Sequence, residues 1–243
     1  MSKRLMCVIA HPDDECFAFG GALALAAREG VEIYVVCLTD GQAATNRGTA
    51  TTSEELGKIR RVEFAASCDV LGVTKHELLD YQDGQLEFAS FSETAGKLVQ
   101  RIRSWKPQVV LTFGLDGAIN THADHTMVSC FTSAAFHWSA RSKRYVGDEE
   151  PFAPQKLYHQ STSFILPDRD PLMPAPWTLS LDIREVQDVK VKAFHQHVSQ
   201  LPVFDKVKPF WDEHGGEEYY LLAAAARPQV AAREQSMFDH VIL

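Results

Sequence analysis

The chain has 243 residues, of which 45% are hydrophobic and 23% charged, and its formal net charge is −8. This composition and length allow one large α/β domain over 1–243, while the acidic balance, without any run of Lys and Arg, excludes a basic surface for nucleic acid. We recognise no signal peptide and no apolar stretch long enough to span a membrane, so we expect a soluble, cytoplasmic protein.

Strands and helices alternate from the start of the chain. The apolar runs Leu5–Ala10 and Val31–Leu38 predict two buried strands, and the alanine-rich segment Phe17–Glu29 predicts a helix between them. A strand, a helix and a second strand at this spacing form a βαβ unit, so we expect a parallel sheet. Gly20 and Gly21 do not complete a G-x-G-x-x-G, which disfavours a dinucleotide as cofactor.

The same alternation continues after a polar loop at 42–52. The predicted elements are, in chain order, a helix at Ser53–Gly72, a strand at Lys75–Tyr81, a helix at Glu93–Trp105, a strand at Pro107–Phe113 and a helix at about Asp124–Ser139. Four strands and four helices in alternation are typical of a Rossmann-like, doubly wound, mostly parallel sheet. We place this core at about 1–140.

The remainder of the chain, about 141–243, is predicted to form a small C-terminal elaboration. The proline-rich segment Arg141–Pro176 is irregular, with one strand around Leu157. After it, the sequence predicts a strand at Thr178–Ile183, a helix at Glu185–Gln200 and an edge strand at Glu218–Ala224.

Polar residues gather where the first predicted strand ends, in the run Ala-His-Pro-Asp-Asp-Glu at 10–15. In open α/β sheets the ligand crevice lies at the C-terminal ends of the strands. One imidazole and three carboxylates here are electrostatically costly unless a cation or the amides of the next helix offset them. Adjacent Asp13 and Asp14 must point in different directions, so one can bind a metal while the other faces its water. Alternatively, the carboxylates only cap the next helix.

A second polar cluster, His122-Ala-Asp-His125, follows the fourth predicted strand. If these residues form the first turn of a helix, the two imidazoles lie on one face, with Asp124 close enough to orient one of them. The C-terminal ends of parallel strands share one edge of the sheet, so this cluster can meet the one around His11. Together they predict a site of two histidines and one carboxylate.

The two motifs, AHPDDE at 10–15 and HADH at 122–125, resemble the LmbE-like, or PIG-L, family of zinc-dependent N-acetylglucosaminyl de-N-acetylases. The resemblance covers most of the chain. Further family-like features are Thr39, Gly41, Arg60-x-x-Glu63, Ala66, Leu71-Gly72-Val73, Asp83-Gly84, and Lys192-Ala193 leading to His197-Val198-Ser199-Gln200.

The resemblance implies roles for particular residues. It implies three metal ligands, His11, Asp14 and His125. It makes Asp13 the general base and His122 an acid or oxyanion stabiliser that Asp124 orients. It also implies that Arg60 lies near the sugar pocket, and that His197 contacts substrate.

Blander alternatives remain open for the last two residues. Arg60 and Glu63, three positions apart on a predicted helix, can form a surface ion pair, and His197 can be structural. Two departures from the family pattern also matter. Ala123 stands where the motif usually has proline, which loosens the turn without removing a functional atom. Asn120 and Thr121 stand where glycine is usual, which leaves the substrate contacts of that loop open.

These features predict a hydrolase that removes an N-acetyl group from a small molecule or glycoconjugate containing N-acetylglucosamine. A set of two histidines and one carboxylate suits Zn²⁺, and Fe²⁺ or another divalent metal also accepts it. The five cysteines form no CxxC pair that would hold zinc instead. The alternatives are a hydrolase of another amide or an ester, and a non-catalytic, metal-stabilised carbohydrate-binding protein. The oligomeric state stays open, a homo-oligomer included.

Overall fold

One seven-stranded sheet forms the centre of the computed structural model, which describes residues 2–118, 120–164, 173–228 and 232–243. Its strand order is β3-β2-β1-β4-β5-β7-β6. The strands are β1 (Arg4–Ile9), β2 (Glu32–Thr39), β3 (Lys75–Tyr81), β4 (Val109–Thr112), β5 (Lys156–Ser161), β6 (Leu179–Asp182) and β7 (Glu217–Ala225). The strands β1 to β5 pair in parallel, and β7 is antiparallel to both β5 and β6. The predicted mostly parallel, doubly wound sheet is therefore confirmed.

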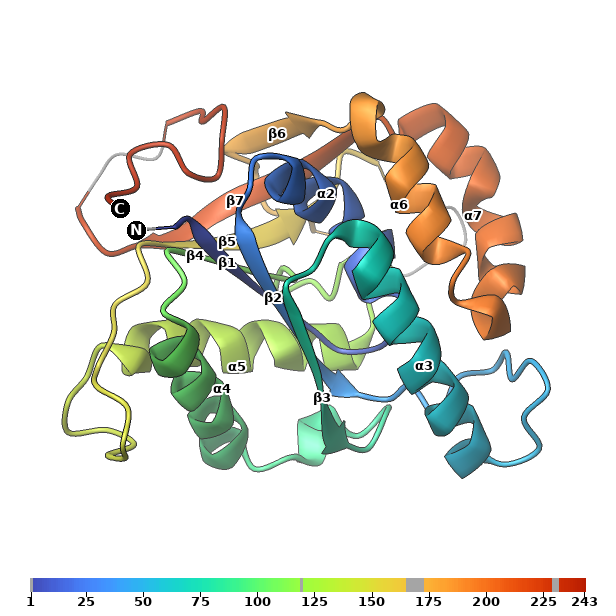
Figure 1. Cartoon of the computed structure of the whole chain (residues 1–243), viewed down its shortest axis with the longest axis horizontal. Helices are drawn as coiled ribbons and strands as arrows, with labels where there is room; N and C mark the ends of the chain where they lie inside the picture. Colours follow the sequence, from blue (N-terminus) through green and yellow to red (C-terminus); the bar gives the residue numbers. More distant parts are fainter. Residues whose placement is uncertain (1, 119, 165–172, 229–231) are drawn as a thin grey trace.

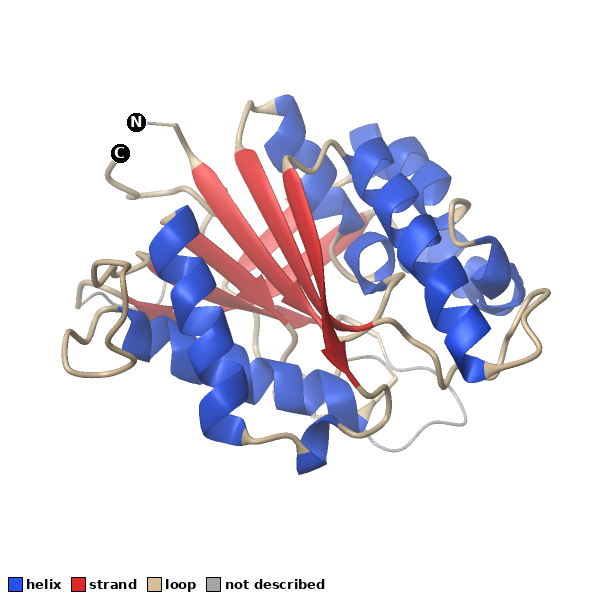
Figure 2. Ribbon diagram, turned by 60° about the horizontal axis from the view of Figure 1, so that its bottom comes forward, coloured by secondary structure: helices blue, strands red, loops and turns tan. Residues whose placement is uncertain are grey.

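Helices cover both faces of this sheet (Figures 1 and 2). They are α1 (Asp14–Phe17), α2 (Gly20–Arg28), α3 (Ser53–Leu71), α4 (Phe91–Trp105), α5 (Ala123–Ser139), α6 (Gln187–Phe194) and α7 (Leu201–His214), with short 3-10 turns at η1 (Leu86–Phe88), η2 (Arg184–Val186) and η3 (Val198–Gln200). Figure 1 shows α4 and α5 on one face and α2, α3 and α6 on the other. Because both faces are covered, β1 and β2 are almost continuously apolar and buried.

The prediction of one continuous helix at 17–29 is wrong. The structure has two helices, since α1 ends at Phe17 and α2 begins at Gly20. The backbone amides of Gly21 and Ala22, at the start of α2, donate to the buried Glu218 carboxylate at 2.8 and 2.9 Å. The break thus exposes a helix N-terminus, whose partial positive charge stabilises a carboxylate from β7.

The C-terminal part of the structure differs from the sequence-based prediction in three places. The segment 217–225 is not an edge strand, because β7 lies between β5 and β6. The helix expected at 185–200 ends at Phe194, and the next residues turn back toward the sheet through η3. The third difference is α7, a helix that the sequence does not predict; its Pro202 occupies the tolerated first turn and its Pro209 lies inside the helix.

The irregular segment expected at 141–176 falls partly outside the described residues, which omit 165–172. The strand expected around Leu157 is β5, and it extends the parallel sheet next to β4. Among the helices that the structure describes, none combines the length and apolar character needed to cross a membrane.

Candidate metal centre and active site

The two polar motifs meet at the point where the strand order of the sheet reverses. β1 lies between β2 and β4, and the ends of β1 and β4 open into the same crevice. His11 follows β1 by two residues, Asp14 begins α1, and His125 lies in the first turn of α5. The parallel sheet therefore brings together side chains that are more than a hundred residues apart in sequence.

Asp14 lies at the centre of this cluster. Its Oδ1 is 3.2 Å from Nε2 of His125, and its Oδ2 is 3.5 Å from Nδ1 of His11. The backbone amide of His11 donates to the same Oδ2 at 2.8 Å, which holds the carboxylate in place. His11, Asp14 and His125 are all buried, and one ligand atom from each lies within 4.8 Å of the others.

The opposite edges of the two imidazoles determine where their protons lie. Nε2 of His11 is 3.1 Å from Asp83 Oδ1 and 3.2 Å from Asp124 Oδ2, and Nδ1 of His125 is 3.1 Å from the Gly117 carbonyl oxygen. Carboxylate and carbonyl oxygens only accept, so these nitrogens carry the protons of the neutral rings. Nδ1 of His11 and Nε2 of His125, only 3.3 Å apart, then direct lone pairs at each other and at Asp14.

Three electron-pair donors that converge without a shared proton need a positive charge between them. The surroundings of His11 also favour a positive charge. Burial alone would lower the pKa of His11, but the neighbouring carboxylates Asp124, Asp14 and Asp83 raise it well above the usual value. A divalent cation at the cluster meets this demand. The donor set, two imidazoles and a carboxylate with space on one side, therefore fits a metal such as zinc.

The ring of His125 is also fixed by packing. Phe113, at the end of β4, stacks on it with ring centroids 3.9 Å apart and an interplanar angle of 2°. The carbonyl that accepts from His125 belongs to Gly117, whose φ is 79°. A Cβ there would lie 2.9 Å from the His122 carbonyl oxygen, so only glycine fits this turn.

Asp13 has a strained backbone, with φ at 104°. A non-glycine residue in this region costs on the order of 1–3 kcal/mol. Its amide donates to Glu15 Oε2 at 2.9 Å, and its Oδ2 accepts from Arg60 Nη2 at 2.9 Å. Burial raises the pKa of Asp13 to about 6, with the Arg60 charge opposing and the Asp14 charge adding to the shift.

Arg60 is buried, and its guanidinium donates hydrogen bonds to two backbone carbonyls as well as to Asp13. Nη1 donates to the Gly41 carbonyl at 2.9 Å, and Nη2 also donates to the Pro12 carbonyl. The alternative of a surface ion pair with Glu63 is wrong, because Glu63 is also buried and bonds elsewhere. The substrate contact implied for Arg60 stays a prediction.

Glu15 and His197 form a fully buried pair behind Asp13. His197 Nε2 is 2.6 Å from Glu15 Oε1, and the Ser67 hydroxyl donates to the same oxygen at 2.6 Å. Burial alone would raise the pKa of Glu15, but the His197 charge and these hydrogen bonds keep it below its usual value. The His197 side chain thus contacts Glu15 and does not line the cavity, so its implied substrate contact has no support in this geometry.

The residues after His197 secure the same region. Ser199 donates to both oxygens of Glu63, through its amide at 2.7 Å and its hydroxyl at 2.6 Å. Gln200 donates to the Asn46 carbonyl at 3.0 Å. This C-terminal segment therefore ties α3 and α1 together beneath Asp13.

We expect His197→Ala to destabilise the fold by about 3–5 kcal/mol, because it leaves the buried Glu15 carboxylate without its counter-charge. Denaturant unfolding of the metal-free protein measures the effect. His195→Ala is the matched control, since His195 is exposed two residues away and its loss should change little. Equal unfolding free energies for the two variants would contradict a structural role for the Glu15 and His197 pair.

His122 caps the N-terminus of α5. Its Nδ1 accepts from the amide of Asp124 at 3.2 Å, so the neutral ring carries its proton on Nε2. Burial lowers the pKa of His122, and the nearby His11 and His125 add to this shift. The ring lines the cavity beside His11, with centroids 4.7 Å apart.

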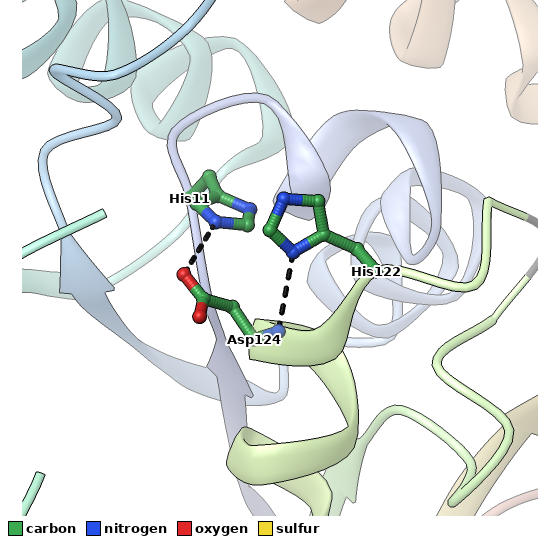
Figure 3. A group of neighbouring side chains, drawn as sticks. All are labelled: His11, His122 and Asp124. Atoms are coloured by element: carbon green, nitrogen blue, oxygen red, sulfur yellow. Dashed lines mark hydrogen bonds and ion pairs between the residues drawn. The ribbon is translucent and has the colours of Figure 1, made fainter. Parts of the chain in front are cut away.

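The Asp124 carboxylate is directed at His11 and not at His122, the residue that it was predicted to orient (Figure 3). Its other contacts explain this direction, since it accepts from the amides of Gly84 at 2.7 Å and Leu86 at 3.1 Å, just after β3. Only the backbone of Asp124 reaches His122. Asp83, for which the sequence suggested no role, also accepts from His11; it lies two residues after the end of β3, and this position at the C-terminal end of a parallel strand was the signal for it.

A cavity of ≈ 570 Å³ opens over these residues. Its lining includes the three candidate ligands His11, Asp14 and His125, which we call the metal cluster, and the neighbouring residues Asp13, Arg60, Asp83 and His122. Its other walls are formed by the ends of β5 and β7, by the loop at 43–46 and by α6 and α7.

The geometry can be set beside known proteins. The model of the PIG-L family, described as GlcNAc-PI de-N-acetylase, matches residues 6–136, which contain both motifs. The chain belongs to the PIG-L family. This membership confirms the predicted family and, with the deacetylases among its relatives, the predicted class of enzyme.

Two curated relatives and one solved structure illustrate the similarity. A mycothiol S-conjugate amidase of Streptomyces coelicolor is 32% identical over 64% of this chain, and the matched region covers 60% of that protein's length. A 1D-myo-inositol 2-acetamido-2-deoxy-alpha-D-glucopyranoside deacetylase of Actinosynnema mirum is 30% identical over 93% of this chain and 88% of its own. The N,N'-diacetylchitobiose deacetylase from Pyrococcus horikoshii has the same fold, with a TM-score of 0.74 at 23% identity over 90% of this chain and 83% of that one.

Proposed function

We propose that this PIG-L family chain is a metal-dependent hydrolase that removes the N-acetyl group from a small molecule or glycoconjugate containing N-acetylglucosamine. The observation that carries the proposal is the convergence of His11 Nδ1 and His125 Nε2 on the buried Asp14 carboxylate, in the lining of one cavity. Relatives named as deacetylases of an acetamido sugar support the choice of substrate class.

The metal ligands in this proposal are His11, Asp14 and His125. A divalent metal held there would polarise the amide carbonyl and make water a stronger nucleophile. We propose zinc, because a set of two nitrogens and one oxygen donor suits it, although Fe²⁺ accepts the same ligands. Comparing the metals in the same enzyme preparation decides between them.

Asp13 is proposed as the general base. A carboxylate with a pKa of about 6 is mostly ionised at neutral pH and accepts the proton of the attacking water readily. Arg60 bonds one carboxylate oxygen of Asp13 and two backbone carbonyls around it, which leaves the other oxygen to the cavity. We therefore assign Arg60 a positioning role next to the substrate contact that the family resemblance implies.

His122 is proposed as the hydrogen-bond donor to the oxyanion, while Asp13, once it has accepted the proton of the attacking water, delivers that proton to the leaving nitrogen. The Nδ1 of His122 is occupied by the amide of Asp124, so Nε2–H is the group that it offers to the cavity. Asp124 then has two positioning tasks, holding His122 through its amide and His11 through its carboxylate. In this proposal Asp124 positions His122 through its backbone amide and not through its carboxylate.

Acetate release from N-acetylglucosamine derivatives tests the proposed function. We expect chelation to reduce the rate to background and stoichiometric Zn²⁺ or Fe²⁺ to restore it. N-propionyl and O-acetyl analogues run in parallel would identify a hydrolase of another amide or an ester. Saturable binding of the sugar without release of acetate, in protein shown to contain one metal per chain, would overturn catalysis and favour a carbohydrate-binding protein.

A further inference from the structure

One wall of the cavity is apolar and comes largely from α7. Val203, Val207, Phe210 and Trp211 recur on one face of this helix at helical spacing, and all four line the cavity while only half-buried. The neighbouring Phe204 is the residue by which α7 packs on the fold, since it is 7% exposed. The four residues thus remain exposed to the cavity after α7 has been anchored, and we call them the α7 wall.

The α7 wall is continuous with the metal cluster. Asp14 and Phe17 lie three positions apart on α1, and both line the cavity. The ring of Phe17 packs against Trp211 of the wall with centroids 5.4 Å apart, and against Phe194 of α6 at 5.9 Å. The apolar surface therefore begins one helical turn from a proposed metal ligand, and one molecule can reach both.

The chemistry of this wall favours an apolar occupant over a hydroxylated one. A sugar ring can stack its C–H face on Phe210 or Trp211, but hydroxyls placed against Val203 and Val207 would lose water without gaining hydrogen bonds. An alkyl or aryl group loses nothing there and removes apolar surface from water on both sides. A cavity of ≈ 570 Å³ also falls in the range of drug-sized ligands, of about 300–1,000 Å³.

We infer that the substrate carries an apolar aglycone, an aryl group or an alkyl chain of several carbons, which packs on the α7 wall while its acetamido group lies at the metal cluster. The inference rests on the proposed function and specifies its substrate class. Each methylene buried on the wall should raise affinity about fourfold, the factor that corresponds to the transfer free energy of one CH₂.

The test compares methyl, butyl, octyl and phenyl glycosides of N-acetylglucosamine with the zinc-loaded enzyme, below the micelle concentration of the octyl compound. We expect kcat/KM to rise by at least about tenfold from methyl to octyl, mainly through KM. In Val207→Asn the octyl advantage should largely disappear, because a polar amide replaces part of the α7 wall. Lys206→Asn is the matched control on the exposed face of the same helix and should keep the advantage.

Calorimetric binding of octyl and methyl glucosaminide, the deacetylated products, separates this inference from the proposed function. Tighter binding of the octyl compound that Val207→Asn abolishes would support the α7 wall even in protein that releases no acetate. Acetate release at the same kcat/KM from all four glycosides, with equal binding of the two products, would overturn the inference and leave the proposed function standing.

Discussion

Asp13→Asn is expected to bind its metal as the unsubstituted chain does and to turn over substrate about 10²- to 10⁴-fold more slowly, the usual contribution of a general base. Asparagine keeps an oxygen for the Arg60 guanidinium, and it tolerates the left-handed backbone of this position better than most residues. Its amide nitrogen cannot accept a proton. Steady-state acetate release and metal content measured on the same preparation test the prediction.

A second substitution provides the control for Asp13. Asp40→Asn removes a carboxylate that pairs with Arg61, the residue after Arg60 in α3. Because Asp40 is not part of the cavity lining, this substitution should leave turnover unchanged. If Asp13→Asn lost its metal as Asp14→Asn does, the two aspartates would have exchanged roles. Unchanged turnover in a metal-loaded Asp13→Asn protein would require another base.

His125→Ala should lose both the metal and almost all turnover, because it removes one of three proposed ligands at a buried site. Binding to the folded state alone stabilises a protein in proportion to the logarithm of ligand concentration over Kd. Zinc should therefore raise the Tm of the unsubstituted chain and leave that of His125→Ala nearly unchanged. Elemental analysis after gel filtration gives the corresponding stoichiometry.

Two further variants sharpen this prediction. His137→Ala lies on the exposed side of the same helix and should keep both the metal and the shift in Tm. Asp83→Ala removes an acceptor of the His11 Nε2 proton and of the Ala43 amide but no proposed ligand, and such partners of a ligand typically contribute about 10–100-fold in metal affinity. A His125→Ala protein that retained stoichiometric zinc would contradict the proposed ligand set.

The sequence predicted the parallel sheet and the meeting of its two polar motifs. Helical and strand periodicity are local properties, and β1, β2, α3 and β4 follow them closely. Once the strands are parallel, their C-terminal ends share one edge, so His11 and His125 must lie near each other. The family resemblance then supplied the proposed ligands and base; the proximity of His11, Asp14 and His125 is consistent with the proposed ligands, and the role of Asp13 stays a prediction.

The sequence could not predict the partners that reach across the fold. Glu15 and His197 are 182 positions apart, and their pairing depends on how α6 ends and η3 turns back. The same holds for the Asp124 carboxylate, whose direction follows from the amides of Gly84 and Leu86 after β3.

The amino-acid sequence was enough to predict the alternation of strands and helices, the edge of the sheet at which the two polar motifs lie, and the family to which the chain belongs. These depend on short-range periodicity and on motifs within six residues. The buried pairing of His197 with Glu15, the inner position of β7 and the apolar wall that α7 gives the cavity are apparent only in the folded chain. Burial and hydrogen-bond partners are set by packing between distant segments, which no local pattern encodes.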